Sequence, residues 1–186
     1  MIRPSCPVPR LVLSALFMVF VSEARADIFA DIPGIPGEST SPVALGQIVL
    51  RSASFGSERG LAAVAKQKTS AACTAKTSAQ ICEVFITKGV DKASPKLFMA
   101  AAAGTRFPTV TLNYFANDVS GPTQYLKIVL ANALIDSISS SGSTLDTPTE
   151  SVRLTCTSME TTYSKKDEAG QTQTETATAT FCQAPF

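Results

Sequence analysis

The sequence contains no histidine and no tryptophan. Histidine is the usual general base near neutral pH and the commonest protein ligand of transition metals, so its absence argues against most catalytic and metal-binding sites. The sequence also lacks a Gly-x-Ser-x-Gly nucleophile motif, a phosphate-binding glycine loop and a paired-carboxylate motif. These absences predict a protein that is not an enzyme and that uses no cofactor or metal.

An excess of charge of either sign is missing as well. The chain has 16 basic and 15 acidic residues among 186. Such a balance gives no long-range attraction to nucleic acid or to an anionic membrane. The lysines at positions 66, 68 and 76 have no aromatic residues interleaved with them, as a groove for single-stranded nucleic acid would. We therefore expect no nucleic-acid partner.

No apolar run reaches the roughly 20 residues that a membrane-spanning helix needs. The N-terminal run, Leu11–Val21, has 11 residues and follows Arg3 and Arg10. The small residues of Ala24-Arg25-Ala26 then occupy the two positions that signal peptidase reads. This pattern indicates a signal peptide over residues 1–26, and the alternative is an uncleaved membrane anchor.

Cleavage between Ala26 and Asp27 would leave a mature chain of 160 residues, 27–186, with 13 basic and 14 acidic side chains. A chain of this length forms one domain and buries a core without help from a metal or cofactor. We expect it to be exported, either to the periplasm or to the medium, and to have no membrane contact after cleavage.

Cysteine usage agrees with export. Of five cysteines, Cys6 leaves with the signal peptide, and Cys73, Cys82, Cys156 and Cys182 remain. An even number in an exported chain favours two disulfides, for which three connectivities exist. The alternative is a zinc site with four thiolates, but the Cys-x-x-Cys pairs typical of such sites are absent.

The mature sequence is rich in segments where apolar and polar residues alternate. Such alternation predicts half-buried strands with one face on a core and one toward solvent or a neighbour. Asn132 interrupts the last of these segments, and the turn residues 33–37 follow the first. The polar stretches Ser52–Gln80 and Ser137–Thr149 are predicted to be long loops. The predicted strands are Asp27–Ile32, Gln47–Leu50, Cys82–Thr87, Thr109–Phe115 and Tyr125–Ile138.

One helix is predicted between the strands. Ser94 is placed as its N-cap, Pro95 stands at the first helical position and Gly104 is placed to end it. The alanines 100–103 would let another element approach closely. Asp91-Lys92 is predicted to begin this helix and to stay solvated.

The C-terminal segment is predicted to form a hairpin. Glu150–Tyr163 and Thr172–Cys182 flank a polar turn centred near Ala169, so residues whose numbers sum to about 338 face each other. Cys156 and Cys182 satisfy this condition and would be cross-strand neighbours within disulfide range. That pairing would leave Cys73 with Cys82.

The segment Val84–Leu97 is similar to the most characteristic stretch of the haemolysin-coregulated protein (Hcp) family, in which a strand leads through Val-Asp-Lys-Ala-Ser-Pro into the major helix. The resemblance extends to Phe29–Ser39, Gln124–Ile128 and Pro148–Val152, in the order of the family. The residues that carry it around the helix and the hairpin are Lys88, Val90, Asp91, Lys92, Ala93, Ser94, Pro95, Leu97, Pro148, Thr149, Glu150 and Ser151.

The resemblance implies a mainly β fold, a compact β-barrel of two antiparallel or mixed sheets with one flanking α-helix, akin to phage tail-tube proteins. It also implies a non-enzymatic structural role in type VI secretion, in which copies of the chain form hexameric rings that stack into a tube. The partners implied are the chain itself, small effector proteins in the lumen, and sheath or spike components.

Two features depart from the family. Its members usually lack a signal peptide, because their tubes assemble in the cytoplasm. The tryptophans common in the family's second strand are also missing, and Leu50–Gly56 holds Arg51 and Phe55 instead. An alternative function is therefore an exported binding module with the Hcp fold that is not part of a secretion tube.

The cleavage site gives a direct prediction. N-terminal sequencing of the exported protein is expected to begin at Asp27, because signal peptidase recognises the small residues of Ala24-Arg25-Ala26. A sequence beginning at Met1 would contradict the signal peptide.

Overall fold

The structure is a computed structural model that describes residues 26–59, 80–118, 121–144, 147–167 and 170–181. Within these ranges it contains nine strands and one helix, and that helix is too short and too weakly apolar to cross a membrane. The helix is α1 (Ser94–Ala103). The strands are β1 (Ala26–Asp31), β2 (Ile48–Leu50), β3 (Ser52–Arg59), β4 (Gln80–Gly89), β5 (Arg106–Asp118), β6 (Gly121–Ser141), β7 (Thr149–Thr155), β8 (Ser158–Lys166) and β9 (Thr172–Thr180).

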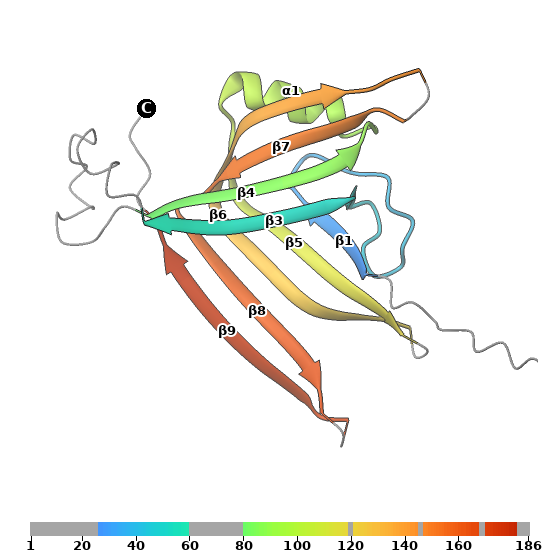
Figure 1. The fold of residues 1–186 in the computed structure, drawn as a ribbon, viewed down its shortest axis with the longest axis vertical. Helices are drawn as coiled ribbons and strands as arrows, with labels where there is room; N and C mark the ends of the chain where they lie inside the picture. Colours follow the sequence, from blue (N-terminus) through green and yellow to red (C-terminus); the bar gives the residue numbers. More distant parts are fainter. Residues whose placement is uncertain (1–25, 60–79, 119–120, 145–146, 168–169, 182–186) are drawn as a thin grey trace, which may run out of the picture.

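The strands form one sheet in which every pairing is antiparallel. Its main path runs β2-β1-β5-β6-β7-β4-β3, and the β8–β9 hairpin branches from β6. Figure 1 shows two groups of strands that cross steeply, with β3, β4 and β7 in one group and β5, β8 and β9 in the other. The path does not close, but its end strands β2 and β3 are separated only by Arg51. The predicted mainly β fold with one flanking helix is confirmed, although one bent sheet replaces two separate ones.

Strand β6 belongs to both groups because it bends. Along one edge, its residues 126–131 pair with β8, whereas residues 134–141 pair with β7. Asn132 lies between these two ladders and has φ of 50°, the one positive value outside glycine among the described residues. Asparagine tolerates this left-handed conformation better than most residues. The interruption predicted at Asn132 is thus the point where the strand changes partner.

The core lies between the two groups of strands. The predicted alternation holds in β4, where Cys82, Val84 and Ile86 are buried and Phe85 is exposed. It also holds for the inward face of β5 and of the first half of β6. Helix α1 covers the sheet beside β6 and contributes Leu97 to the same core. The inward residues of β5 and β6 are Val110, Leu112, Tyr114, Ile128 and Leu130.

The outward face of β5 is partly covered, contrary to the prediction that it faces solvent or a neighbour. The segment between β1 and β2 lies over this face, where Ala44 forms a second apolar cluster with Phe29 and Phe115. Beside this cluster Asn113 is buried, accepts a hydrogen bond from the Gln124 amide and donates one to the Gln47 amide. Polar side chains on this face are therefore paired across strands.

Two predicted loops are partly strand. Ser52–Arg59 forms β3, which has little apolar periodicity of its own and is held by pairing with β4. Ser137–Ser141 continues β6 because β7 lies alongside it. Tertiary pairing outweighs weak local propensity in both cases. Residues 60–79 of the first predicted loop lie outside the described part of the chain.

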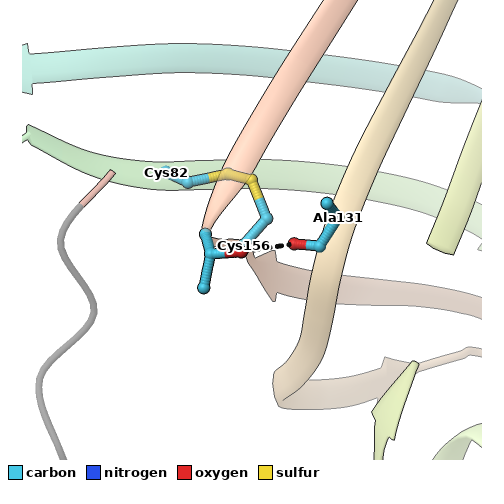
Figure 2. The surroundings of a disulfide bond; sticks show 4 residues. Cys82, Ala131 and Cys156 are labelled. Atoms are coloured by element: carbon cyan, nitrogen blue, oxygen red, sulfur yellow. Dashed lines mark hydrogen bonds between the residues drawn. A yellow bond between two sulfur atoms is a disulfide. The ribbon is translucent and has the colours of Figure 1, made fainter. Parts of the chain in front are cut away.

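The predicted disulfide pairing is wrong. Figure 2 shows the bond between Cys82 and Cys156. Their Cα atoms are 5.4 Å apart. The predicted hairpin register is nevertheless confirmed, because Ser158 of β8 faces Thr180 of β9. Pairing of β4 with β7 places Val84 opposite Leu154, and two residues further the same register places the two cysteines opposite each other. That contact joins distant segments of the chain, so local hairpin geometry could not reveal it.

Cys73 and Cys182 lie outside the described residues, as does the predicted signal peptide up to residue 25. Ala26 and Asp27 are exposed at the start of β1. Cleavage between them stays a prediction.

The disulfide can be tested by its effect on stability. Replacing both Cys82 and Cys156 by Ala is expected to lower the free energy of unfolding by about 4 kcal/mol, because the bridge closes a long loop of the unfolded chain. The sequence separation is 74 residues. Urea unfolding of the oxidised proteins measures the loss. Non-reducing peptide mapping should yield the Cys82–Cys156 peptide, and a Cys156–Cys182 peptide would contradict the structure.

Candidate functional site

A buried lysine stands at the end of β4. Lys88 has no solvent exposure, and its ammonium nitrogen lies 2.8 Å from a carboxylate oxygen of Asp91 and 2.8 Å from one of Glu150. It also donates to Ser94 Oγ at 3.0 Å and to the Gly89 carbonyl at 2.7 Å. A buried ammonium is tolerated only when it is paired and hydrogen-bonded in this way.

Glu150, at the start of β7, is the second centre of this charge cluster. It accepts hydrogen bonds from Ser94 Oγ at 2.6 Å and from Ser140 Oγ at 3.2 Å, besides that from Lys88. Burial raises the pKa of its carboxyl, but the three hydrogen bonds and the charge of Lys88 outweigh burial and hold the pKa below its ordinary value. The carboxyl is therefore ionised at neutral pH.

The same cluster starts helix α1. Asp91 Oδ1 accepts the Ala93 amide at 2.8 Å, and Ser94 Oγ accepts the Asp91 amide at 3.0 Å. This reciprocal arrangement is like a capping box, with Asp91 in the capping role that was predicted for Ser94. Gly104 ends the helix as predicted, but Ser94 is the first helical residue and Pro95 the second, one position later than predicted. The prediction that Asp91 stays solvated is wrong, since its side chain is 12% exposed and paired with Lys88.

The turn after β1 is fastened to the helix start. Glu38 Oε1 accepts the Lys92 amide at 3.0 Å, and the Lys96 ammonium donates to the Gly34 carbonyl at 3.0 Å. Gly37 is needed because a Cβ there would lie 2.2 Å from the Gln47 carbonyl oxygen. Segments 29–39 and 84–97, which both carry the family resemblance, therefore lie against each other.

The segment before β7 is fastened to the end of β4. The Val90 amide donates to the Pro148 carbonyl at 3.1 Å, and the Arg51 guanidinium donates to Thr149 Oγ1 at 2.6 Å. Three segments far apart in sequence therefore meet where β4 ends and α1 begins.

The motif residues divide by exposure. Lys88, Ala93, Ser94, Leu97 and Glu150 are buried and hold the junction together. Val90, Lys92, Pro95, Pro148 and Ser151 are exposed, while Asp91 and Thr149 are half-buried.

The charge cluster was not predicted, although the alternation of residues in β4 and β7 indicates it. Lys88 falls on the same side of the β4 alternation as Val84 and Ile86, and Glu150 falls on the same side as Val152 and Leu154. A charged residue on the inward face of each of two strands indicates a buried ion pair. Ser140 carried no such signal, because it reaches Glu150 through the pairing of β6 with β7.

The arrangement is suited to holding structure in place. The ammonium of Lys88 donates to side chains and a carbonyl of its own domain, and neither it nor Glu150 is accessible to a substrate.

Removing the lysine tests the junction. Replacing Lys88 by Met is expected to destabilise the domain by about 3–5 kcal/mol, because Glu150 is left buried without its cation. Replacing the exposed Lys92 by Met is the matched control and should change stability by less than about 0.5 kcal/mol. Urea unfolding measures both, and equal effects would contradict a central role for the cluster.

Acid should weaken the same contact. Since the folded-state pKa of Glu150 is lowered, its contribution to stability is present above the unfolded pKa, about 4.3, and is lost as pH falls through the folded value. Between about pH 5 and about pH 2, a Glu150→Gln variant should lose less stability than the wild type. If the free energies of unfolding of the two proteins, measured in urea, changed with pH in parallel, this coupling would be refuted.

Comparison with known proteins gives the fold a context. Residues 29–163 match the family described as type VI secretion system effector, Hcp. A search of curated proteins by sequence finds no match.

Solved structures of the same fold are similar over most of their length. Hcp1 from Salmonella typhimurium is 24% identical, with a TM-score of 0.64 over 84% of this chain and 94% of that chain. A type VI secretion system effector from Yersinia pestis is 22% identical, with a TM-score of 0.63 over 83% of this chain and 99% of that chain. With the family match over most of the sequence, these findings establish that the chain belongs to the Hcp family of type VI secretion proteins.

Proposed function

We propose that the exported mature domain is a structural subunit that closes into a hexameric ring of the type VI tube kind. The observation that carries this proposal is that two long strands of one domain each have an unpaired edge. Among the described residues β9 pairs only with β8, and β3 pairs only with β4.

The edge of β9 has few features that would prevent strand addition. Natural edge strands are commonly protected by lysine, proline or a bulge. The segment Thr172–Thr180 has no lysine and no proline, and Glu175 is its one charged residue. Its other side chains are threonine, alanine and glutamine, which suit a pleated strand. This edge is therefore open to a strand from another molecule.

Free edges on different strands favour a ring over a two-fold dimer, and besides β9 and β3 only the three-residue β2 has one among the described residues. If β9 of one copy meets β3 of the next, the contact is heterologous, and such contacts close into a ring when the rotation permits. The number six comes from the family resemblance, as do stacking and effector proteins in the lumen.

Exposed apolar side chains supply further contact area. Phe98 and Met99 of α1 are 61% and 63% exposed, and Leu45 is 76% exposed. Large apolar side chains gathered at a surface are typical of contact sites between proteins. The outward residues of the helix thus support a contact with a neighbouring subunit.

Charge on the β9 edge should prevent the ring. We expect light scattering of oxidised mature protein to give a hexamer, and the Thr174→Lys/Thr178→Lys variant to give mainly monomer because lysines block strand addition. Glu160→Lys is the matched control, since it changes the charge by the same amount and Glu160 faces Thr178 from β8, which at that position is paired with both β6 and β9.

A wild type that stays monomeric across a concentration series would defeat the ring and favour the exported binding module instead. A variant that stays hexameric would show that the ring does not use β9.

A further inference from the structure

Cys156 lies at the corner where the chain passes from β7 to β8. Opposite this corner, β6 bends at Asn132 and exchanges its partner strand. The corner is held by Thr157, whose amide and hydroxyl both donate to the Ala131 carbonyl, at 3.0 and 3.1 Å. Figure 2 shows Ala131 beside the bridge. The Phe181 amide, just after β9, donates to the Thr157 carbonyl at 2.7 Å.

Apart from the corner, the β8–β9 hairpin is attached to the rest of the described sheet by one ladder. Only residues 158–163 of β8 pair with β6, and β9 has no described neighbour beyond β8. Met159 and Phe181 are the hairpin residues buried in the core, and both lie next to the corner. Every residue of β9 except Ala179 is exposed. The corner therefore holds the buried end of the hairpin, and the ladder with β6 holds the inner strand β8 beyond it.

The disulfide is the covalent part of that anchor. Hydrogen-bonded pairing of β4 with β7 stops at Val84 and Leu154, and the bridge links the chains at the next inward position. The bridge thus fastens the corner to β4, which belongs to the other group of strands.

The two sulfurs are also sealed. Cys82 is 2% exposed and Cys156 is 1% exposed. A thiolate attacks a disulfide only along an accessible path to one sulfur. The bridge can therefore form or be reduced only while the corner is open.

We propose that the Cys82–Cys156 bridge is a redox lock on the β8–β9 hairpin, set once when the domain folds in an oxidising compartment. Two cysteine thiols exchange with an external disulfide donor: the Cys82–Cys156 bond forms, the donor bond breaks, and two electrons and two protons pass to the donor thiols. In the reduced chain the hairpin opens locally while the rest of the sheet stays folded. The lock acts within one subunit and is independent of ring formation.

Hydrogen exchange followed by mass spectrometry tests the lock on the oxidised mature protein. In the Cys82→Ala/Cys156→Ala variant, exchange of the amides of residues 158–166 and 172–180 is expected to accelerate at least about tenfold more than that of the β5 amides, whose acceleration reports the global loss of stability. Val84→Ala is the matched control, because it removes core volume from the same face of β4 but leaves the bridge intact. It should accelerate exchange across the sheet without singling out the hairpin.

Unchanged hairpin protection, or equal acceleration in β5 and the hairpin, would overturn the proposal. If the double variant does not fold, the wild type provides the second measurement. Reduction of Cys82–Cys156 by dithiothreitol, followed by alkylation and peptide mapping, should be about 100-fold slower in buffer than in full denaturant, since a closed corner blocks access. Equal rates would show that the bridge is not sealed.

Discussion

The burial of one ammonium group organises the structure around the start of the helix. Lys88 lies buried near the end of β4. Its charge is tolerated there only because Glu150 and Asp91 neutralise it and Ser94 accepts a hydrogen bond from it. Each partner has a second structural role. Glu150 lies at the start of β7, Asp91 caps α1, and Ser94 accepts a hydrogen bond from the Asp91 amide. A single electrostatic requirement therefore fixes how β4, β7 and the helix meet.

A second constraint governs the opposite end of β4. There the sheet divides, because β6 bends at Asn132 and leaves β7 for β8. The bend lets one strand serve both groups, and the ladder of β6 with β8 ends beside it. The disulfide and the hydrogen bonds of Thr157 lie at this interruption. β4 is thus fastened by charge at one end and by a covalent bond at the other.

The charge cluster and the disulfide relate to export and assembly in different ways. The charge cluster is independent of redox conditions and serves the family fold itself. The bridge agrees with the export that the sequence predicts, since disulfides persist in oxidising compartments. It also stabilises the part of the domain that carries the free β9 edge. A preordered edge lowers the entropic cost of binding a neighbour.

The sequence alone determined the strand-rich class, the helix with Pro95 and Gly104 at its ends, the hairpin register and the break at Asn132. Each depends on residues close together in the chain, through alternation, capping or turn chemistry. Only the tertiary structure decided that β3 is a strand, that Ser140 reaches Glu150, and that Cys156 bonds to Cys82. These contacts join different strands, separated by 10 residues between Ser140 and Glu150 and by 74 between the two cysteines. The pairing of strands sets them, and no local pattern encodes which strands become neighbours.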